Sequence, residues 1–262
     1  MIVFCLGLGA VAGFFAGLFG IGAGVLMVPA LHELYAAHGF GPELSLRLAL
    51  GTSMAGIVFN SLSSLSAHHR RGAVRWPVVI RLSPGIVVGT LAGSQLAGQL
   101  PVRWLSVFFA GFLLLIAVQM ALDMRPKATR TLPGTAGLAG VGGAIGVIMS
   151  LIAGGGGMLS IPFLIWCNVG LREAIGTAAA IGFPIAVSGS LGYVLSGWSA
   201  AALPAYSLGY VFLPALAATA ATSSLTAPLG ARAAHRLPTA ALRRGFALFL
   251  LLVAARMLYK TL

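Results

Sequence analysis

The chain has 262 residues, of which 59% are hydrophobic and only 8% are charged. A soluble domain carries about 25% charged residues, so this composition excludes an ordinary soluble domain. The formal net charge is +12, but the basic residues are scattered between apolar segments and form no basic helix face. We therefore expect the lipid bilayer, and no nucleic acid, as a partner of this chain.

Three long stretches of the sequence carry no charged residue at all, at 2–31, 132–171 and 174–231. Each is longer than the roughly 20 apolar residues that a helix needs to cross a bilayer. The sequence therefore predicts an all-α polytopic membrane protein. Cys5 and Cys167 both lie in apolar surroundings, without the spacing of a disulfide framework or a metal site.

In chain order, the sequence predicts two long glycine-interrupted segments, each followed by three apolar spans. Glycine costs a helix interior roughly 0.5–1 kcal/mol relative to alanine, so we expect both segments to break at their glycines. The first segment covers 2–36, with spans at 44–66, 76–98 and 103–122; the second covers 133–166, with spans at 174–195, 205–230 and 239–259.

The second half of the chain repeats the first. The stretch GFFAGLFGIGAGVLMVPAL (13–31) aligns with GVIMSLIAGGGGMLSIPFL (146–164) at a constant offset of 133, with seven identities in 19 positions. Farther along, ALGTSMA matches AIGTAAA, and LPVRW matches LPTAA at the last span of each half. We therefore divide the chain into two homologous membrane repeats, at 1–127 and 128–262.

The charge of the loops distinguishes two topologies. If each opening segment crosses once, the halves lie parallel; if it enters and returns, as a re-entrant hairpin or two short helices, the halves are inverted. With the loop HHRRGAVRW (68–76) in the cytoplasm, the parallel topology places nine of the 16 basic residues inside, and the inverted topology places twelve inside. Because cytoplasmic loops carry the excess of Lys and Arg, we predict inverted-topology repeats.

The consecutive glycines indicate a binding site inside the membrane. Inverted-repeat transporters pair two interrupted helices near the midplane, where helix N-termini offer free N–H groups to an anion. Non-helical backbone at this depth is tolerated only where it lines a cavity or is buried in protein. The predicted substrate-binding glycines are Gly22, Gly24, Gly154, Gly155, Gly156 and Gly157.

Glycines spaced four residues apart have a different interpretation. This spacing is typical of helices in close contact, whereas close packing does not require a consecutive run such as 154–157. We therefore expect the spaced glycines to pack helices. They are Gly9, Gly13 and Gly17, and likewise Gly85, Gly89 and Gly93.

Four polar side chains complete the predicted site. Thr52, Ser53 and Thr177 follow the glycine that opens the next span of each half, and Asn60 lies deeper in the first of these spans. The hydroxyls are suited to donate to an oxyanion, but they can equally bond the carbonyl one turn back in their own helix. We expect Asn60 to face the protein interior, where it contacts either substrate or a neighbouring helix.

Ionisable residues are missing from the middle of the predicted spans. Glu33, Glu43, Asp123 and Glu173, the four acidic residues, all lie near span ends, whereas proton-coupled pumps bury such groups mid-membrane. The sequence has no Walker motif, no metal-ligand pair and no nucleophile triad, so we predict neither an enzyme nor a metal site nor a cofactor. Anion export from a negative cytoplasm can be driven by the substrate gradient and by the potential, which contributes about 2.3 kcal/mol per charge per 100 mV.

Three blocks of sequence carry a family resemblance: GIGAGVLMVPAL, ALGTSMAGIVFNSLSSLSAHHRRGAVRW, and AGGGGMLSIPFL with the following AIGTAAAIGFP. Together they resemble the TauE/SafE sulfite exporter family, over essentially the whole chain. The resemblance implies a multi-pass permease of the bacterial inner membrane that exports sulfite or an organosulfonate. The first glycine run departs from the usual pattern at Ile21 and Ala23, and Ala178 stands where the first half has Ser53, so we expect an asymmetric site.

Two other functions stay open from the sequence alone. The same scaffold is suited to import of another small anion, such as sulfate, thiosulfate or an organic acid. A non-transporting membrane subunit that anchors a partner is the third alternative, but the glycine clusters and the lack of any sizeable soluble region favour a transporter. The sequence does not fix the oligomeric state, and a homodimer is compatible with it.

Overall fold

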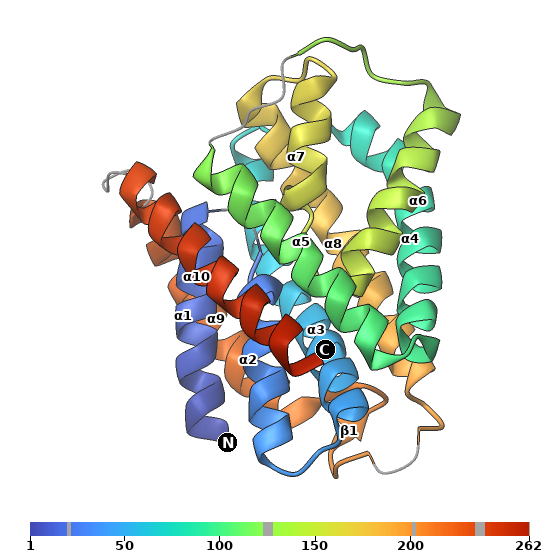
Figure 1. Ribbon diagram of the computed structural model, residues 1–262. Helices are drawn as coiled ribbons and strands as arrows, with labels where there is room; N and C mark the ends of the chain where they lie inside the picture. Colours follow the sequence, from blue (N-terminus) through green and yellow to red (C-terminus); the bar gives the residue numbers. More distant parts are fainter. Residues whose placement is uncertain (20–21, 123–127, 201–202, 234–238, 262) are drawn as a thin grey trace.

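The computed structural model describes residues 1–19, 22–122, 128–200, 203–233 and 239–261 (Figure 1). These residues form helices and one short β-hairpin. The first half contains α1 (Ile2–Phe19), α2 (Gly24–Ala37), α3 (Pro42–Arg70), α4 (Trp76–Gln99) and α5 (Val102–Ala121). The second half contains α6 (Thr135–Leu151), α7 (Gly157–Trp166), α8 (Leu171–Ser196), β1 (Ser207–Leu208), β2 (Val211–Phe212), α9 (Leu213–Ala233) and α10 (Thr239–Thr261).

The predicted all-α membrane fold is confirmed, with one correction to a helix boundary. Helices α3, α4, α5 and α8 coincide with predicted spans and are long and apolar enough to cross a membrane; the last predicted span lies within α10. The span predicted at 205–230 is wrong at its start, because α9 begins only at Leu213. Tyr206 and Gly209 adopt left-handed φ angles of 65° and 54°, which turn the chain into the β1–β2 hairpin.

Each glycine-interrupted segment forms two helices that double back. Figure 1 places the start of α1 and the end of α2 at the same end of the molecule. In the second half, the N–H groups of Thr129 and Arg130, which precede α6, donate to the carbonyl of Trp166 at the end of α7 (3.2 and 3.0 Å). The second segment therefore ends beside the point where it began, as a re-entrant pair of helices does.

The helices of the two halves pack in matching pairs. Helix α4 packs along α6 as α1 packs along α9, and the third and fifth helices of each half pack against each other as α3–α8 and α5–α10. Gly51 near the start of α3 lies against Tyr193 near the end of α8, while Ser61, farther along α3, lies against Gly182, earlier in α8. Helices α3 and α8 therefore run antiparallel.

Small residues hold the α4–α6 and α1–α9 pairs in close contact. A Cβ atom at Gly85 or Gly89 would collide with the α6 backbone at Ala139 or Gly143. Gly9 meets the α9 backbone in the same way. The packing role predicted for glycines spaced by four residues is confirmed at these positions.

One threonine of each half forms a hydrogen bond with the backbone of a segment that connects two helices of the other half. The Oγ1 atom of Thr177 on α8 accepts a hydrogen bond from the N–H of Arg75, at the start of α4 (3.0 Å). The Oγ1 atom of Thr52 on α3 accepts one from the N–H of Phe212, just before α9 (3.0 Å). We call these two contacts the threonine latches.

The glycine that precedes each threonine makes its latch possible. Gly176 lies against the carbonyl of Ala73, and Gly51 lies against the carbonyl of Tyr210, so a side chain at either glycine would displace the connection. The β1–β2 hairpin lies at the lower end of the molecule in Figure 1, and the turn from α3 to α4 lies at the upper end. The two latches therefore fasten the halves together at opposite ends.

A substitution that removes the latch hydroxyl but keeps the size of the side chain should destabilise the protein. We expect Thr177→Val to lower the free energy of unfolding by about 1–3 kcal/mol, because the partly buried N–H of Arg75 loses its acceptor. Thr177→Ser keeps the acceptor and should stay within about 1 kcal/mol of the wild type. Unfolding of the purified protein in detergent measures both values, and equal stability of the two variants would contradict the latch.

The close α4–α6 contact predicts opposite effects for two glycine-to-alanine changes. Gly89→Ala should destabilise the protein by about 1–3 kcal/mol through overpacking against Gly143. Gly111→Ala on α5 has open space around its Cβ position and should be neutral or stabilising, because alanine favours helix over glycine by up to about 1 kcal/mol. Thermal unfolding of both variants under the same detergent conditions checks this order.

Candidate functional site

The first break lies between α1 and α2. Residues 20–21 lie outside the described residues, and Gly22 follows with a left-handed φ of +85°, a conformation that favours glycine. Ala23 caps α2, and its carbonyl accepts hydrogen bonds from the N–H groups of Leu26 and Met27 (3.1 and 3.0 Å). Within the described residues no side chain caps this helix, and the N–H groups of its first two residues, Gly24 and Val25, have no acceptor there.

The second break, between α6 and α7, is described in full. The chain leaves α6 through Ala153, whose φ is 46°, and the N–H of Gly154 donates back to the carbonyl of Met149 (2.8 Å). This is the six-to-one hydrogen bond of a Schellman C-cap. Gly156 then caps α7 without a side-chain hydrogen bond. Among the described residues, the N–H groups of Gly155 and Gly156 have no acceptor.

The two breaks are in direct contact. The Gly155 nitrogen lies 3.0 Å from the position that a Cβ of Gly22 would occupy, and a Cβ at Gly24 would collide with the carbonyl of Ala153. Residues 152–156 are all buried. Because α2 and α7 both begin at this contact, the positive ends of two helix dipoles lie close together in a buried place, an arrangement that favours an anion.

Helices α3 and α8 cover the two breaks with corresponding surfaces. The Cδ1 atom of Ile57 on α3 lies 3.3 Å from the Cβ position of Gly24. On α8, the carbonyl of Ala178 and the backbone of Gly182 lie against Gly156. Each break is therefore covered by the third helix of its own half.

Three buried polar groups close to the breaks have no hydrogen-bond partner in the described structure. Ser53 and Asn60 share the face of α3 that carries Ile57, since they lie four residues before it and three residues after it. The Ser53 hydroxyl and the Asn60 Nδ2 are buried and unpartnered, although Asn60 Oδ1 accepts a hydrogen bond from Ser223 (3.3 Å). The Ser160 hydroxyl, about one turn into α7, is buried and unpartnered as well.

Unpartnered buried groups indicate that a polar species belongs beside them. Each such group costs about 1–3 kcal/mol, and the N–H groups of the two breaks add to this cost. A bound oxyanion with several acceptor oxygens can satisfy hydroxyl, amide and backbone donors at once. The geometry therefore favours a small, multidentate acceptor over an apolar ligand.

The predicted asymmetry of the site is visible in its covering helices. The α8 positions that match Ser53 and Asn60 hold Ala178 and Ile185, and both side chains are buried. The α3 surface therefore offers polar groups, whereas the equivalent α8 surface is apolar. The two breaks have similar backbones but different side-chain environments.

The structure separates the predicted site residues into two groups. Glycines 22, 24 and 154–157 lie at the two breaks, with Ser53 and Asn60 on the covering face of α3. Thr52 and Thr177 form the latches, and the partner of each is a backbone N–H of the other half, which neither sequence alternative anticipated. Ser160 was not among the predicted site residues, although its position about one turn after the glycine run was an available signal.

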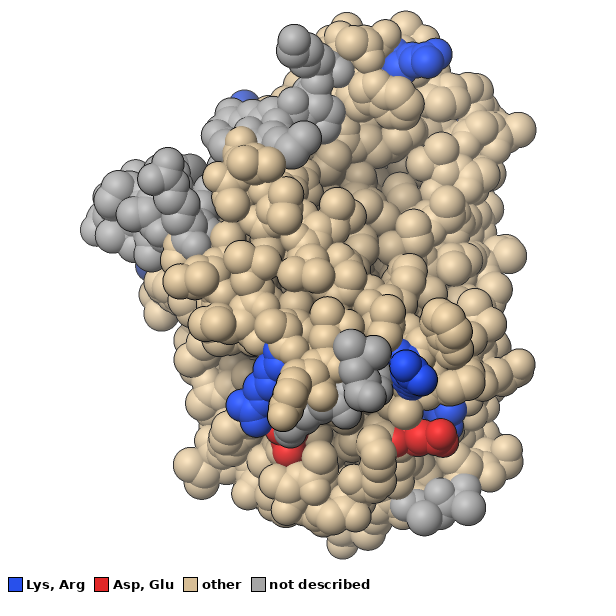
Figure 2. Space-filling model, viewed as in Figure 1, with Lys and Arg blue, Asp and Glu red and all other residues tan. Residues whose placement is uncertain are grey.

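Charged side chains lie near the ends of the molecule and away from the breaks. Among the described residues, ion pairs join Arg75 to Glu173 (2.7 Å), Arg256 to Glu33 (3.2 Å) and Arg47 to Glu43 (3.8 Å). Figure 2 shows a largely uncharged surface between the charged side chains near the two ends of this face. The part of the chain that the structure describes contains no group of three His, Cys, Asp or Glu side chains suited to hold a metal ion.

Comparison with known proteins gives a consistent result. The family model described as sulfite exporter TauE/SafE matches residues 5–257. A probable membrane transporter protein of Haemophilus influenzae is 38% identical over 99% of this chain and 98% of its own length. The probable membrane transporter protein YdhB of Bacillus subtilis is 26% identical over 71% of this chain and 76% of its own.

Two further findings complete the comparison. A probable membrane transporter protein of Methanocaldococcus jannaschii is 26% identical over 79% of this chain and 76% of its own length. No solved structure matches the chain. The family match and the Haemophilus relative both span nearly the whole sequence, which carries the glycine breaks and the spans around them. The chain therefore belongs to the TauE/SafE family of membrane transporters.

Proposed function

We propose that this chain is a multi-pass permease of the bacterial inner membrane that exports sulfite or a related small sulfur-containing anion, such as an organosulfonate. The single observation that carries this proposal is the contact of the two glycine breaks. There, the uncapped starts of α2 and α7 meet in a buried place. The family to which the chain belongs supports sulfite as the first substrate to test.

Binding in this proposal rests mainly on backbone N–H groups. Helix N-termini carry about half a positive charge each, and a low-dielectric environment strengthens their attraction for an anion. The Ser53 and Ser160 hydroxyls and the Asn60 amide, which are buried and unpartnered, add donors at the sides. Because no described residue at the breaks carries a full positive charge, the anion is held without a strong ion pair and can leave on either side.

The proposal includes inverted repeats at 1–127 and 128–262. Support comes from the antiparallel α3 and α8, the doubling back of α6 and α7, and the latches at opposite ends of the molecule. The upper end in Figure 1 carries the turn between α3 and α4, with Arg70, Arg71 and Arg75, and is assigned to the cytoplasm by the excess of positive charge.

The membrane potential should drive export of a net negative charge. Moving one charge outward through 100 mV releases about 2.3 kcal/mol, and a dianion gains roughly twice this amount. In proteoliposomes loaded with radiolabelled sulfite, we expect an interior-negative potential to accelerate efflux and an interior-positive potential to slow it. Protein-free liposomes under the same potentials supply the control.

Three outcomes of this flux measurement would separate the alternatives. Sulfite flux that does not depend on the membrane potential would contradict electrogenic export but would still support sulfite transport. Inhibition of labelled sulfite flux by sulfate, thiosulfate or a carboxylate, with faster transport of that ion, would favour a carrier of another anion. Flux of no oxyanion at all would favour the non-transporting membrane subunit.

Removing the unpartnered hydroxyls should lower transport and spare the fold. Position 53 of α3 corresponds to position 178 of α8, which is already alanine. Ser53→Ala therefore makes the two helices alike at this position, and it removes a buried hydroxyl that has no hydrogen-bond partner. We expect unchanged or higher stability, because no hydrogen bond within the protein is lost, and a roughly tenfold weaker apparent affinity for sulfite, which corresponds to about 1.4 kcal/mol. Ser160→Ala should behave alike.

Ser94→Ala is the matched control for these variants. Ser94 is also a buried serine, but its hydroxyl donates to the carbonyls of Thr90 and Leu91 in its own helix (2.9 Å each). Its loss should leave the affinity for sulfite unchanged. Concentration dependence of flux and thermal unfolding, measured on all three variants, provide the comparison; a Ser53→Ala protein with wild-type affinity would remove this side chain from the binding site.

A further inference from the structure

A second cavity lies apart from the breaks, at the end of the molecule that carries the β1–β2 hairpin. It has a volume of about 360 Å³ and lies between α2, the first turn of α3, the start of α5 and α10. Its lining includes His32, Glu33, Arg103, Ser106 and Met257. His32 follows Gly24 by eight residues on α2, which is about 12 Å of helix, so this cavity is distinct from the proposed central site.

Two polar side chains of the cavity have no partner in the described part of the chain. Ser106 is only 3% exposed, lines the cavity, and makes no hydrogen bond there. Arg103 forms no ion pair among the described residues. The two side chains lie three residues apart on α5 and therefore on the same face of the helix. The cavity thus combines an exposed guanidinium with the hydroxyl of a buried serine that has no hydrogen-bond partner among the described residues.

The remaining charges near the cavity do not neutralise Arg103. Glu33 is paired with Arg256, whose Nη2 atom lies 3.2 Å from Glu33 Oε2. His32 is held through its Nδ1 by Ser45 Oγ at 2.9 Å. Among the described side chains at the cavity, the one carboxylate, that of Glu33, stands against the guanidiniums of Arg103 and Arg256, so these described groups carry a net positive charge, which favours an anion over a cation.

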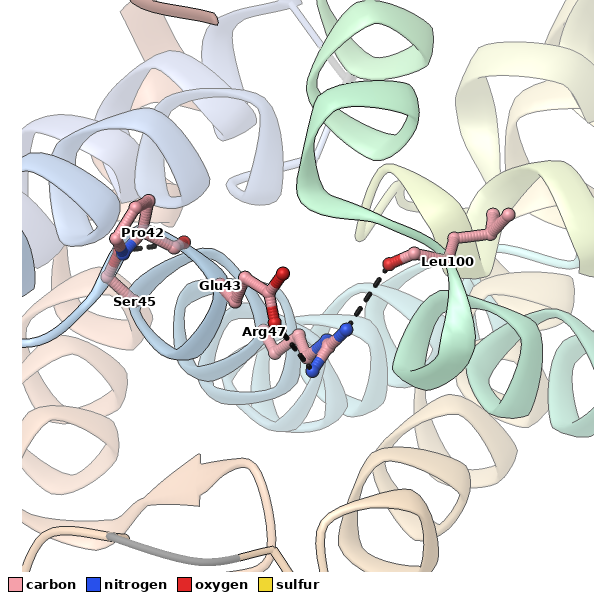
Figure 3. A network of polar contacts seen from close by, with 5 residues as sticks. All are labelled: Pro42, Glu43, Ser45, Arg47 and Leu100. Atoms are coloured by element: carbon pink, nitrogen blue, oxygen red, sulfur yellow. Dashed lines mark hydrogen bonds and ion pairs between the residues drawn. The ribbon is translucent and has the colours of Figure 1, made fainter.

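The start of α5 adds backbone donors and is held in place by α3. Pro101 caps α5 without a side-chain hydrogen bond, so the first N–H groups of this helix lie beside Arg103 without intrahelical acceptors. Figure 3 shows Arg47 of α3 reaching across to Leu100, whose carbonyl accepts a hydrogen bond from Arg47 Nη2 (3.2 Å). Arg47 also pairs with Glu43 (3.8 Å). This network joins α3 to the residue directly before the Pro101 cap of α5, next to the cavity.

We propose that this cavity binds an oxyanion group, either a free tetrahedral ion or the phosphate of a lipid headgroup. The Arg103 guanidinium, the Ser106 hydroxyl and the first N–H groups of α5 hold the oxygens. A guanidinium beside a helix N-terminus is suited to a phospho or sulfo group because several donors reach its oxygens together. Under the proposed topology the site faces the outer side of the membrane, but its binding does not depend on transport at the breaks.

Protection of a cysteine at position 106 tests the site directly. Ser106→Cys is introduced into a Cys5→Ala, Cys167→Ala chain, and its reaction with the uncharged reagent methyl methanethiosulfonate is timed. In detergent, sulfate should slow the reaction at least about threefold at constant ionic strength, the factor 1 + [L]/Kd for an ion at twice its Kd. A parallel arm compares vesicles of phosphatidylcholine alone with vesicles that also contain phosphatidylglycerol.

Two control variants make the outcome decisive. Arg103→Gln in the same chain should abolish the protection, and Ser199→Cys, an exposed position near the end of α8, should react at the same rate with or without sulfate. Protection by sulfate identifies a free-ion site, and protection only by phosphatidylglycerol identifies a headgroup site. Absence of protection in both arms, or protection that survives Arg103→Gln, would overturn the proposal, while sulfite flux through the central site would be unaffected by either result.

Discussion

The structure depends on how backbone N–H groups are satisfied away from water. A continuous helix satisfies them by itself, and any interruption within a membrane must supply other partners. The chain interrupts a helix in each half and brings both interruptions into contact, so the unsatisfied donors of α2 and α7 collect in one buried place. This arrangement is costly unless a hydrogen-bond acceptor is present, and the proposed anion would be held there without a buried positive charge.

Glycine makes this arrangement sterically possible. Gly24 lies directly against the carbonyl of Ala153, so even a methyl group there would force the two breaks apart. Gly156 lies against the carbonyl of Ala178, so a methyl group there would push the second break away from α8. The same principle recurs at the latches, where Gly51 and Gly176 admit a loop carbonyl. Glycine therefore occurs where two backbones are in direct contact. Its cost in helix stability is offset by these contacts, which no larger residue allows.

Much of this architecture was predictable from sequence because it leaves a local signal. Runs of uncharged residues located the helices, and consecutive glycines located the breaks. The spacing of Gly85 and Gly89 predicted the α4–α6 contact, which the structure confirms. These features depend on composition and period, which a single sequence displays directly.

Features that depend on long-range contacts were not predictable in this way. The β1–β2 hairpin lies in an apolar stretch whose composition predicts a helix. The left-handed φ angles of Tyr206 and Gly209, which turn the chain there, are visible only in the structure. The hydroxyls of Thr52 and Thr177 meet backbone groups 160 and 102 residues away in sequence. The unpartnered state of Ser160 and the cavity beside Arg103 likewise appear only once the helices are assembled.

The contact between the breaks also constrains how the molecule can move. Gly22 touches Gly155 through backbone atoms alone, with no flexible side chain between them to absorb a displacement. A shift at the start of α2 is therefore transmitted immediately to the start of α7. We therefore expect the starts of α2 and α7 to move together in any conformational change at the breaks.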